Sequence, residues 1–200
     1  GGLLIHRTSR TLGVFVMNHE VPLMLETEIL CACFNEAESS QFGGSFAFAL
    51  ANQEIQVRRY STDGISNVVF RYILKDSMGT PCCISWMGNL LVVGTKSGFV
   101  VIIDIKKREL QFENLNCGPV ESVTIFEETV FGICEDGSAF YGLEAFYTFI
   151  CPSKAFVPLA QDIIMKLTHN GILELVILPH GLSLSQQSDY LDLPSKRSLL

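Results

Sequence analysis

The sequence repeats one short pattern, in which a turn that usually ends in glycine is followed by an apolar strand. The repeated turns lie at Gly13, Gln53, Gly98, Gly137 and Gly171. They are 40, 45, 39 and 34 residues apart. A period of about 40 residues, with strand, turn and strand inside each unit, is typical of a β-propeller blade of the WD-repeat class. The spacing therefore predicts an all-β, WD-repeat-like β-propeller.

The period divides the chain into five approximate units, at residues 1–34, 43–75, 80–112, 118–150 and 155–180. Residues 1–180 thus supply about four to five blades. Propellers close with about four to eight blades, so we expect this segment to be part of a larger ring, with further blades in a longer chain. Residues 181–200 are polar and indicate a tail or linker. A short helix is expected over Leu159–Leu167.

The third unit shows the order of strands most clearly. Its strands are expected at 81–86, 90–93 and 99–105, with an outer strand that begins at 109. The third strand is apolar at every position from 99 to 103. Because such a strand must be covered on both faces, the pattern favours blades stacked between neighbours. An ordinary β-sandwich is the structural alternative, and it predicts two sheets instead of radial repetition.

Composition supports a buried, sheet-rich interior. Hydrophobic residues make up 48% of the chain, charged residues 18%, and the mean hydropathy is +0.33. We interpret the high hydrophobic content as a sign of apolar faces that pack against missing blades or neighbouring subunits. The apolar runs are too short for a spanning helix, so no direct membrane insertion is expected. A net charge of −7 argues against binding nucleic acid.

Seven cysteines are present, but their spacing does not match a metal site. Cys31 and Cys33 are separated by one residue, and Cys82 and Cys83 are adjacent. The other three stand alone: Cys117, Cys134 and Cys151. An odd count without a secretory signal predicts reduced thiols in a cytosolic compartment. Cys82 and Cys134 lie in strand patterns, where free cysteine packs as a small hydrophobe.

Signals of catalysis are poor. The four histidines share no motif with Asp, Ser or Cys, and there is no nucleophile elbow, Walker A loop or His-Glu-x-x-His motif. We therefore expect that the protein is not an enzyme and that it has no catalytic, cofactor-binding or metal-binding residues. An enzyme with a propeller channel would need inward-facing His and acidic groups from several blades, and the sequence shows no such set.

Two residues of the third unit stand out. Asp104 ends the third strand at the place where the WD dipeptide closes a blade, with Ile103 in place of Trp. We interpret Asp104 as a structural residue that ties the next turn. Trp86 ends an inner strand, where it either packs in the core or anchors a partner at the propeller's face. The turn glycines are also assigned a structural role: Gly13, Gly98, Gly137 and Gly171.

Charged residues gather on the expected turns, where a protein partner would meet them. Besides Trp86, the candidates for partner contact are Lys106, Lys107, Arg108, Glu127, Glu128 and Asp136. The alternative is a solvated turn, because loops lie on the surface. The paired acidic residues are on exposed turns and lack the dry pocket that shifts pKa values.

A family resemblance rests on a succession of short motifs in residues 76–108. The motifs are Asp76-Ser-Met-Gly79, Cys83-Ile-Ser-Trp86, Gly88, Leu91-Val-Val-Gly94, Gly98 and Asp104-Ile-Lys-Lys-Arg108. They resemble a blade of the second propeller in the WD repeat-containing protein 11 family. Phe46–Leu74 resembles the next-upstream blade, and Leu12–Met24 matches loosely. The Trp expected before Asp104 is Ile103, and nothing after Tyr147 matches.

The resemblance implies a non-enzymatic scaffold for vesicle tethering between endosomes and the trans-Golgi network. It also implies a cytoplasmic protein, peripheral at these membranes or at the base of the cilium, with FAM91-type and golgin-associated tethering factors as partners. The functional alternative is the substrate-receptor propeller of a ubiquitin ligase complex, which uses the same fold. Tyr190-Leu-Asp-Leu193 has the form of a tyrosine-based sorting signal, unless the tail begins another blade and buries the tyrosine.

Overall fold

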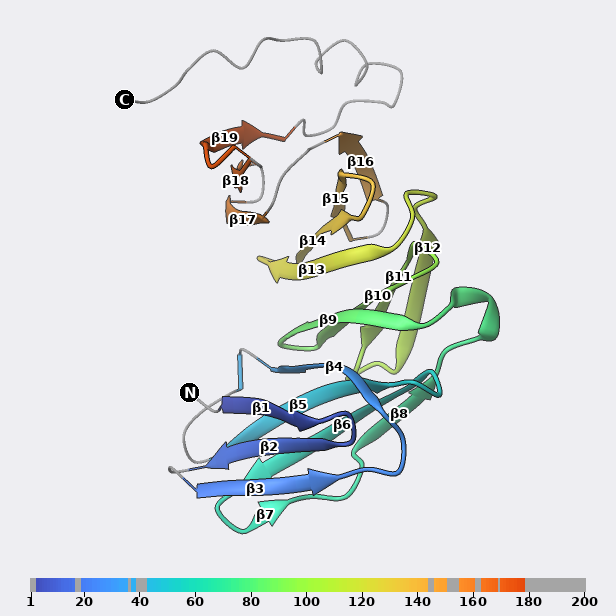
Figure 1. Ribbon diagram of the computed structural model, residues 1–200, viewed down its shortest axis with the longest axis vertical. Helices are drawn as coiled ribbons and strands as arrows, with labels where there is room; N and C mark the ends of the chain where they lie inside the picture. The colour runs from blue at the N-terminus through green and yellow to red at the C-terminus, as the bar shows by residue number, and fades with distance from the viewer. Residues whose placement is uncertain are drawn as a thin grey trace. The chain divides into compact units, whose positions relative to one another are not determined.

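The structure is a computed structural model that describes residues 3–16, 19–35, 37–38, 43–143, 146–150, 155–160, 163–168 and 170–178. The tail at 181–200, including Tyr190–Leu193, lies outside the described residues. The chain divides into two compact units, Gly1–Ile150 and Cys151–Leu200. Both consist of antiparallel sheets in which most strands pair with the next strand along the chain (Figure 1).

The first sheet has three strands and the second has five. The first sheet is formed by β1 (Leu3–Thr8), β2 (Thr11–Val16) and β3 (His19–Met24). The second contains β4 (Ile29–Phe34), β5 (Gly43–Leu50), β6 (Glu54–Ser61), β7 (Gly64–Ile65) and β8 (Phe70–Ile73). Strands β7 and β8 both pair with β6. The segment 29–34, expected in the first unit, instead pairs with β5 and begins the second sheet.

The third and fourth sheets have four strands each, in chain order. The third contains β9 (Pro81–Met87), β10 (Leu90–Thr95), β11 (Phe99–Asp104) and β12 (Glu109–Asn114), after a short 3₁₀ helix at Asp76–Met78. The fourth contains β13 (Val120–Phe126), β14 (Thr129–Cys134), β15 (Ser138–Gly142) and β16 (Phe146–Ile150). These four-stranded antiparallel sheets have the form of propeller blades, as the sequence predicts.

The second unit contains one sheet of three strands, β17 (Ala155–Ala160), β18 (Ile163–Leu167) and β19 (Leu173–Ile177). The helix expected over Leu159–Leu167 is wrong, because this segment forms the end of β17 and all of β18. Val157 pairs with Met165, which in turn pairs with Leu175. Apolar residues at every second position thus build one face of a sheet.

The cores of the first unit lie between successive sheets, and β11 contributes to two of them. Val101 and Ile103 belong to a core with residues of the second sheet, such as Ile55. Val100 and Ile102 belong to a core with residues of the fourth sheet, such as Val130. The prediction that this strand is covered on both faces is therefore confirmed. Alternate side chains of one strand point to opposite faces, so a continuous apolar run serves both cores.

The first two sheets share a third core, in which Phe46 and Phe48 of β5 meet Leu12 and Val14 of β2. Gly13 lies between Leu12 and Val14 in the middle of β2 and pairs with Ile5 of β1. The turn that joins β1 to β2 is at residues 9–10. The assignment of Gly13 to a turn was therefore wrong. A side chain at position 13 would meet the carboxylate end of the exposed Glu20 side chain on β3, which would have to move aside.

The first strands of the second, third and fourth sheets, β4, β9 and β13, are neighbours in space. An isolated parallel bridge joins Asn35, directly after β4, to Trp86 of β9. Strands β4 and β9 therefore run in the same direction, and β13 follows the direction of β9 (Figure 1), which places equivalent turns of these sheets at the same end. Within the described ranges, no helix has the length and apolarity needed to cross a membrane.

Candidate functional site

The turns of the first unit fall into two sets, because consecutive strands of each sheet are antiparallel. In the second, third and fourth sheets, one set joins the first strand to the second and the third strand to the fourth. We call the end of the sheets that carries this set the turn face. It includes the β4–β5 connection and the turns β6–β7, β9–β10, β11–β12 and β13–β14. The β10–β11 and β14–β15 turns lie at the opposite end.

The β11–β12 turn presents the cationic cluster at the turn face. Lys106, Lys107 and Arg108 are exposed, and Arg108 adopts a positive φ of 59°. Asp104 shapes the turn: its Oδ1 accepts from the Lys107 amide at 2.9 Å, and its carbonyl accepts from the Arg108 amide at 2.8 Å. The Lys107 ammonium also lies 3.7 Å from Asp104 Oδ2 and 3.9 Å from Glu109 Oε2. Lys106 and Arg108 make no ion pair with another described residue, so their charges face solvent.

The β13–β14 turn presents two carboxylates at the same face. Glu127 and Glu128 are exposed and have φ values of 45° and 67°. Two successive positive φ values are needed in a two-residue hairpin of type I′, in which Asn-Gly is favoured. Glutamate rarely adopts this conformation. The acidic pair is therefore held in a strained turn, and such strain often marks a functional position.

Asp136 lies at the opposite end, in the β14–β15 turn, where its Oδ1 accepts from the Ser138 amide at 2.8 Å. Gly137 and Gly98 follow at equivalent turn positions with φ of 84° and 79°. In the second unit, Gly171 has a φ of 79° in the β18–β19 turn. The charged residues singled out from the sequence therefore divide between two ends, with five on the turn face and Asp136 away from it.

Trp86 does not lie on a surface. It is 4% exposed and belongs to the core between the second and third sheets. Its indole N–H donates to the carbonyl of Gly88 at 2.9 Å. The Asn35 side-chain amide also binds Gly88. Its Nδ2 donates to the Gly88 carbonyl and its Oδ1 accepts from the Gly88 amide, both at 2.9 Å. Trp86 thus helps to join two sheets, and the role of partner anchor is corrected to one in the core.

A pocket of about 610 Å³ opens at the turn face of the second sheet. It is lined by Gly43, Gly44 and Gly64 and by polar residues of β5, β6 and the segments next to them, including Glu38, Ser45, Arg59, Ser61, Asp63 and Ser66. Ser45 Oγ donates to Glu38 Oε2 at 3.0 Å, and Ser66 Oγ accepts from the Arg59 amide at 3.0 Å. The sequence did not reveal this pocket, because residues from two separate turns build it.

An ion pair between a buried carboxylate and an exposed arginine of the second sheet was also missed. Glu54 is 3% exposed, and Arg71 of β8 donates to both of its oxygens, at 2.6 and 2.8 Å. Gln56 donates to Glu54 Oε1 at 2.6 Å, and Arg58 donates to Gln56 Oε1 at 3.0 Å. Burial opposes ionisation of the Glu54 carboxyl, but the hydrogen bonds from Arg71 and Gln56 outweigh it and hold its pKa below the usual value.

The cysteines differ from the expectation of reduced thiols throughout. A disulfide joins Cys117 to Cys134, with a Cα–Cα distance of 6.0 Å. Cys31, Cys33, Cys82 and Cys83 are half-buried and belong to no disulfide among the described residues, while Cys151 lies outside the described residues. The disulfide was missed because residues 17 apart in sequence meet only when β14 pairs with β13. Over the ranges given above, no group of three or more His, Cys, Asp or Glu side chains could hold a metal ion.

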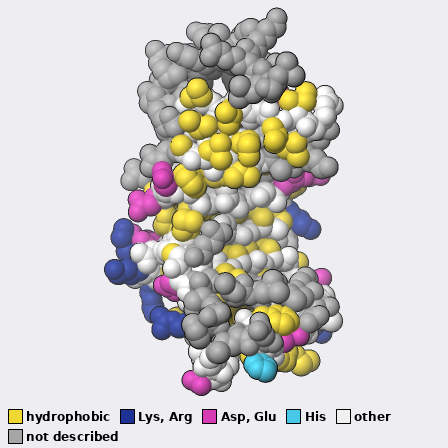
Figure 2. Space-filling view, turned by 90° about the vertical axis from the view of Figure 1, so that its left-hand side faces the viewer, with side chains coloured by type: hydrophobic (Ala, Val, Ile, Leu, Met, Phe, Trp, Pro, Cys, Tyr) yellow, Lys and Arg dark blue, Asp and Glu magenta, His cyan; other side chains and the backbone are white. Residues whose placement is uncertain are grey.

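Charge on the exposed surface is mixed. In the space-filling view, Lys and Arg side chains gather along one edge with Asp and Glu side chains close by (Figure 2). The features of the turn face fit this pattern: a cationic turn at 106–108, an acidic turn at 127–128 and a pocket that contains Arg59, Glu38 and Asp63. This arrangement suits a polar partner that carries both charges.

No protein-family model and no curated protein sequence matches the chain. Solved structures match its fold. Sqt1 of Saccharomyces cerevisiae has a TM-score of 0.63 at 12% identity, over 90% of this chain and 59% of that chain. BBS1N in complex with ARL6DN has a TM-score of 0.62 at 11% identity, over 92% and 62%. A chain of the mitotic checkpoint complex has a TM-score of 0.63 at 13% identity, over 84% and 58%.

These matches establish the fold, which is that of a WD40-type β-propeller. At such low identity they carry no further property to this chain. The chain spans about three fifths of the length of each of these solved chains. It thus corresponds to a part of a propeller of that size.

Proposed function

We propose that this chain is part of a non-enzymatic β-propeller scaffold that binds other proteins through its turn face. The observation that carries the proposal is the presence of three features at one end of the sheets: the pocket, the cations Lys106 and Arg108, which pair with no described carboxylate, and the strained acidic turn Glu127–Glu128. Apolar side chains at the sheet faces are used for packing between sheets. The turns remain free to meet a partner.

The fold supports a binding role. The BBS1N structure is a complex with ARL6DN, and another match belongs to the mitotic checkpoint complex, so propellers of this fold occur in protein assemblies. Because the chain spans about three fifths of those chains, we also propose that further blades complete the ring in a larger propeller.

The finer proposal is a role in vesicle tethering between endosomes and the trans-Golgi network. Its support is the resemblance of residues 76–108 to the WD repeat-containing protein 11 family. On this proposal the protein is cytoplasmic and peripheral at those membranes or at the base of the cilium. Its partners are then FAM91-type and golgin-associated tethering factors.

The test is affinity purification of the natural protein from its source cells, followed by mass spectrometry of everything bound. FAM91-type or golgin-associated partners would support the trafficking role. Cullin adaptors would replace it with the ubiquitin-ligase alternative and leave a protein-binding propeller. Recovery of no specific protein would overturn the scaffold proposal.

A charge-reversed variant tests the turn face itself. Lys106→Glu with Arg108→Glu should weaken capture of the bound proteins by about tenfold, because complementary charges favour association. The matched control is Arg10→Glu with Lys96→Glu, which changes the charge equally on the exposed β1–β2 and β10–β11 turns at the opposite end. Equal capture by both variants would remove the turn face from the proposal. Lys107 is left unchanged because it pairs with Asp104.

A further inference from the structure

One backbone hydrogen bond repeats at the same place in the second and third sheets. In the second sheet, the Leu74 amide, directly after β8, donates to the carbonyl of Gln53 in the β5–β6 turn at 3.0 Å. In the third sheet, the Leu115 amide, directly after β12, donates to the carbonyl of Gly98 in the β10–β11 turn, also at 3.0 Å. The bond therefore ties the end of the last strand to the turn between the second and third strands.

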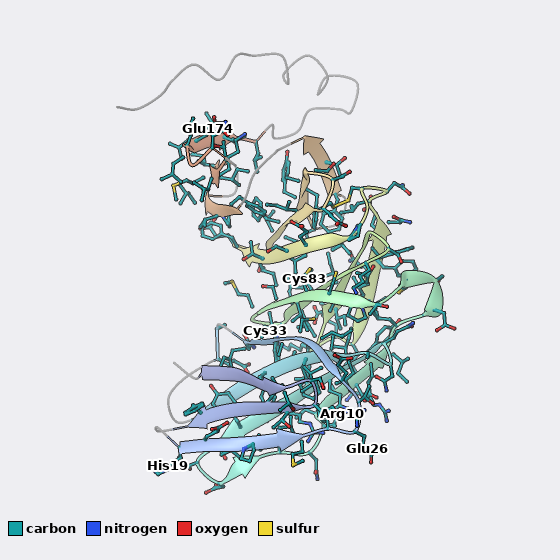
Figure 3. The ribbon with its side chains drawn as sticks, in the orientation of Figure 1. Arg10, His19, Glu26, Cys33, Cys83 and Glu174 are labelled. Atoms are coloured by element: carbon teal, nitrogen blue, oxygen red, sulfur yellow. A yellow bond between two sulfur atoms is a disulfide. The ribbon has the colours of Figure 1, made fainter. Side chains whose placement is uncertain are left out.

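The first sheet makes the same bond, which identifies the position of each of its strands. The Leu25 amide, directly after β3, donates to the carbonyl of Arg10 in the β1–β2 turn at 2.9 Å. Figure 3 labels Arg10 and Glu26 next to each other at one end of this sheet, and His19, the first residue of β3, at the other end. By comparison with the other sheets, β1 and β2 correspond to second and third strands, and β3 corresponds to a last strand.

Packing supports the same assignment. Leu74 lies in the core shared by the second and third sheets, Leu115 packs against the core of the third and fourth, and Leu25 packs against the core of the first and second. Each leucine thus contributes to the core between its own sheet and the next. The second strands β5 and β10 contact the first strands of the following sheets, β9 and β13, and β1 contacts β4 in the same way. Among the described residues, the first sheet has no strand in the first position, and only β2 pairs with β1.

The register of the first sheet shows which backbone groups of β1 point away from β2. Gly13 of β2 pairs with Pro22 on β3 and with Ile5 on β1. Because Pro22 has no N–H, its pair with Gly13 is the kind without hydrogen bonds, and the N–H and C=O of Gly13 point to β1 instead. This direction alternates along a strand, so the backbone N–H and C=O groups of Leu4 and His6 point away from β2. They form an edge that can pair with another strand.

We propose that the β1 edge, defined by the backbone groups of Leu4 and His6, binds an extended strand from a part of the same polypeptide outside residues 1–200, antiparallel to β1. The inference rests on the proposed larger propeller and names the place where its further chain joins this one. In the second, third and fourth sheets, the equivalent place is taken by β4, β9 and β13, which have six or seven residues. A strand of that length would bind through main-chain hydrogen bonds.

The other sheets also indicate the source of this strand. In each of the second, third and fourth sheets, all strands come from one continuous stretch of chain. The solved propeller chains that match this fold are longer, since this chain spans about three fifths of their length. A strand from the same polypeptide therefore fits the β1 edge better than a strand from a separate protein.

The experiment measures amide hydrogen exchange of the natural protein at single-residue resolution. The Ile5 amide points to β2 and is protected with or without a further strand, so it serves as the control within the same strand. If the edge is paired, the Leu4 and His6 amides should exchange within about tenfold of the Ile5 rate. Exchange of Leu4 and His6 at the rate of exposed amides, beside a protected Ile5, would overturn the proposal. The comparison needs no variant, so it does not depend on how a variant folds.

A second measurement identifies the strand. The photo-crosslinking amino acid p-benzoylphenylalanine, placed at position 6 of the natural protein, should capture a peptide of the same polypeptide from outside residues 1–200. The control places it at position 113 on β12, whose sheet lies between two described neighbours, and should capture no such peptide. Capture at position 6 of residues 1–200 alone, or of a different protein, would contradict the proposal.

The outcome is separate from that of the turn-face test. Affinity capture with the Lys106→Glu, Arg108→Glu variant measures binding at the turn face, whereas exchange and crosslinking measure pairing at the β1 edge. A paired edge without bound proteins would overturn the scaffold role alone. Bound proteins with an open edge would overturn the strand proposal alone.

Discussion

At the scale of single residues, buried polar side chains form hydrogen bonds that hold the sheets in place. Asn35 is fully buried, and its amide bonds to both backbone groups of Gly88 on the next sheet. Glu54 is held by Arg71 and Gln56. A buried polar group that loses its partner costs about 1–3 kcal/mol, so these contacts also select one arrangement of the sheets over others.

Replacing Glu54 with Gln should lower the free energy of unfolding by about 2 kcal/mol at pH 7, because the charge that holds Arg71 is lost. The Glu54 pKa is lowered in the folded protein, so its contribution is fully present above the unfolded value of about 4.3 and is lost as the pH falls through the folded value. The variant and the natural protein should therefore converge in acid.

Urea unfolding followed by the fluorescence of Trp86, the sole tryptophan, measures this difference at pH 7 and at acidic pH. The control Glu113→Gln changes an exposed carboxylate on β12 and should have little effect. If the free energy of unfolding of Glu54→Gln stays equally far below that of the natural protein at acidic pH, the side chain acts through packing and not through its charge.

At the scale of elements, the turns define how successive strands meet. The β11–β12 turn is held by Asp104, whose carboxylate and carbonyl both accept backbone hydrogen bonds. The β13–β14 turn has no such support from its own residues among the bonds described, and it places two glutamates at positive φ. The first turn is stabilised locally, whereas the second carries local strain.

Replacing Glu127-Glu128 with Asn-Gly should raise the free energy of unfolding by about 1 kcal/mol, because this pair favours the type I′ turn. If the acidic pair contacts the partner, as the proposed function requires, capture of the bound proteins should weaken at the same time. Thermal unfolding and affinity capture measure the two effects on one variant. A destabilised variant would contradict the assigned turn geometry.

At the scale of the whole molecule, one sheet face is apolar and uncovered among the described residues. Leu173, Leu175 and Ile177 on β19 are 63%, 57% and 75% exposed, and Val157 on β17 is 52% exposed. In the first unit, comparable faces lie in the cores between sheets. This face is therefore suited to packing against another sheet, in agreement with a chain that matches part of larger propellers.

The 200-residue chain by itself should associate, because exposed apolar sheet faces promote aggregation. Leu175→Lys with Ile177→Lys should reduce the associated fraction in analytical ultracentrifugation. The control Asn170→Lys adds a positive charge to the exposed turn before β19 and should reduce association less. A monodisperse natural chain with a cooperative melt would contradict the need for further sheets.

Much of the blade structure could be predicted from local patterns. The strands of the third sheet lie where the sequence places them, and β11 enters two cores because its apolar run has two faces. At the candidate site, the charged turn residues could be identified from the sequence. Their division between the two ends of the sheets could not be predicted from it. Asp136 lies away from the others only because the strand order places it there.

The sequence by itself determined the strands, most of the turns and the all-β architecture, because alternation and turn residues act over a few neighbours. The tertiary structure alone decided which sheet receives β4, that Gly13 lies inside a strand, and that Trp86 is buried. It also brought together Glu54 with Arg71 and Asn35 with Trp86. These relations depend on contacts between distant segments, and the spacing of residues along the chain does not encode them locally.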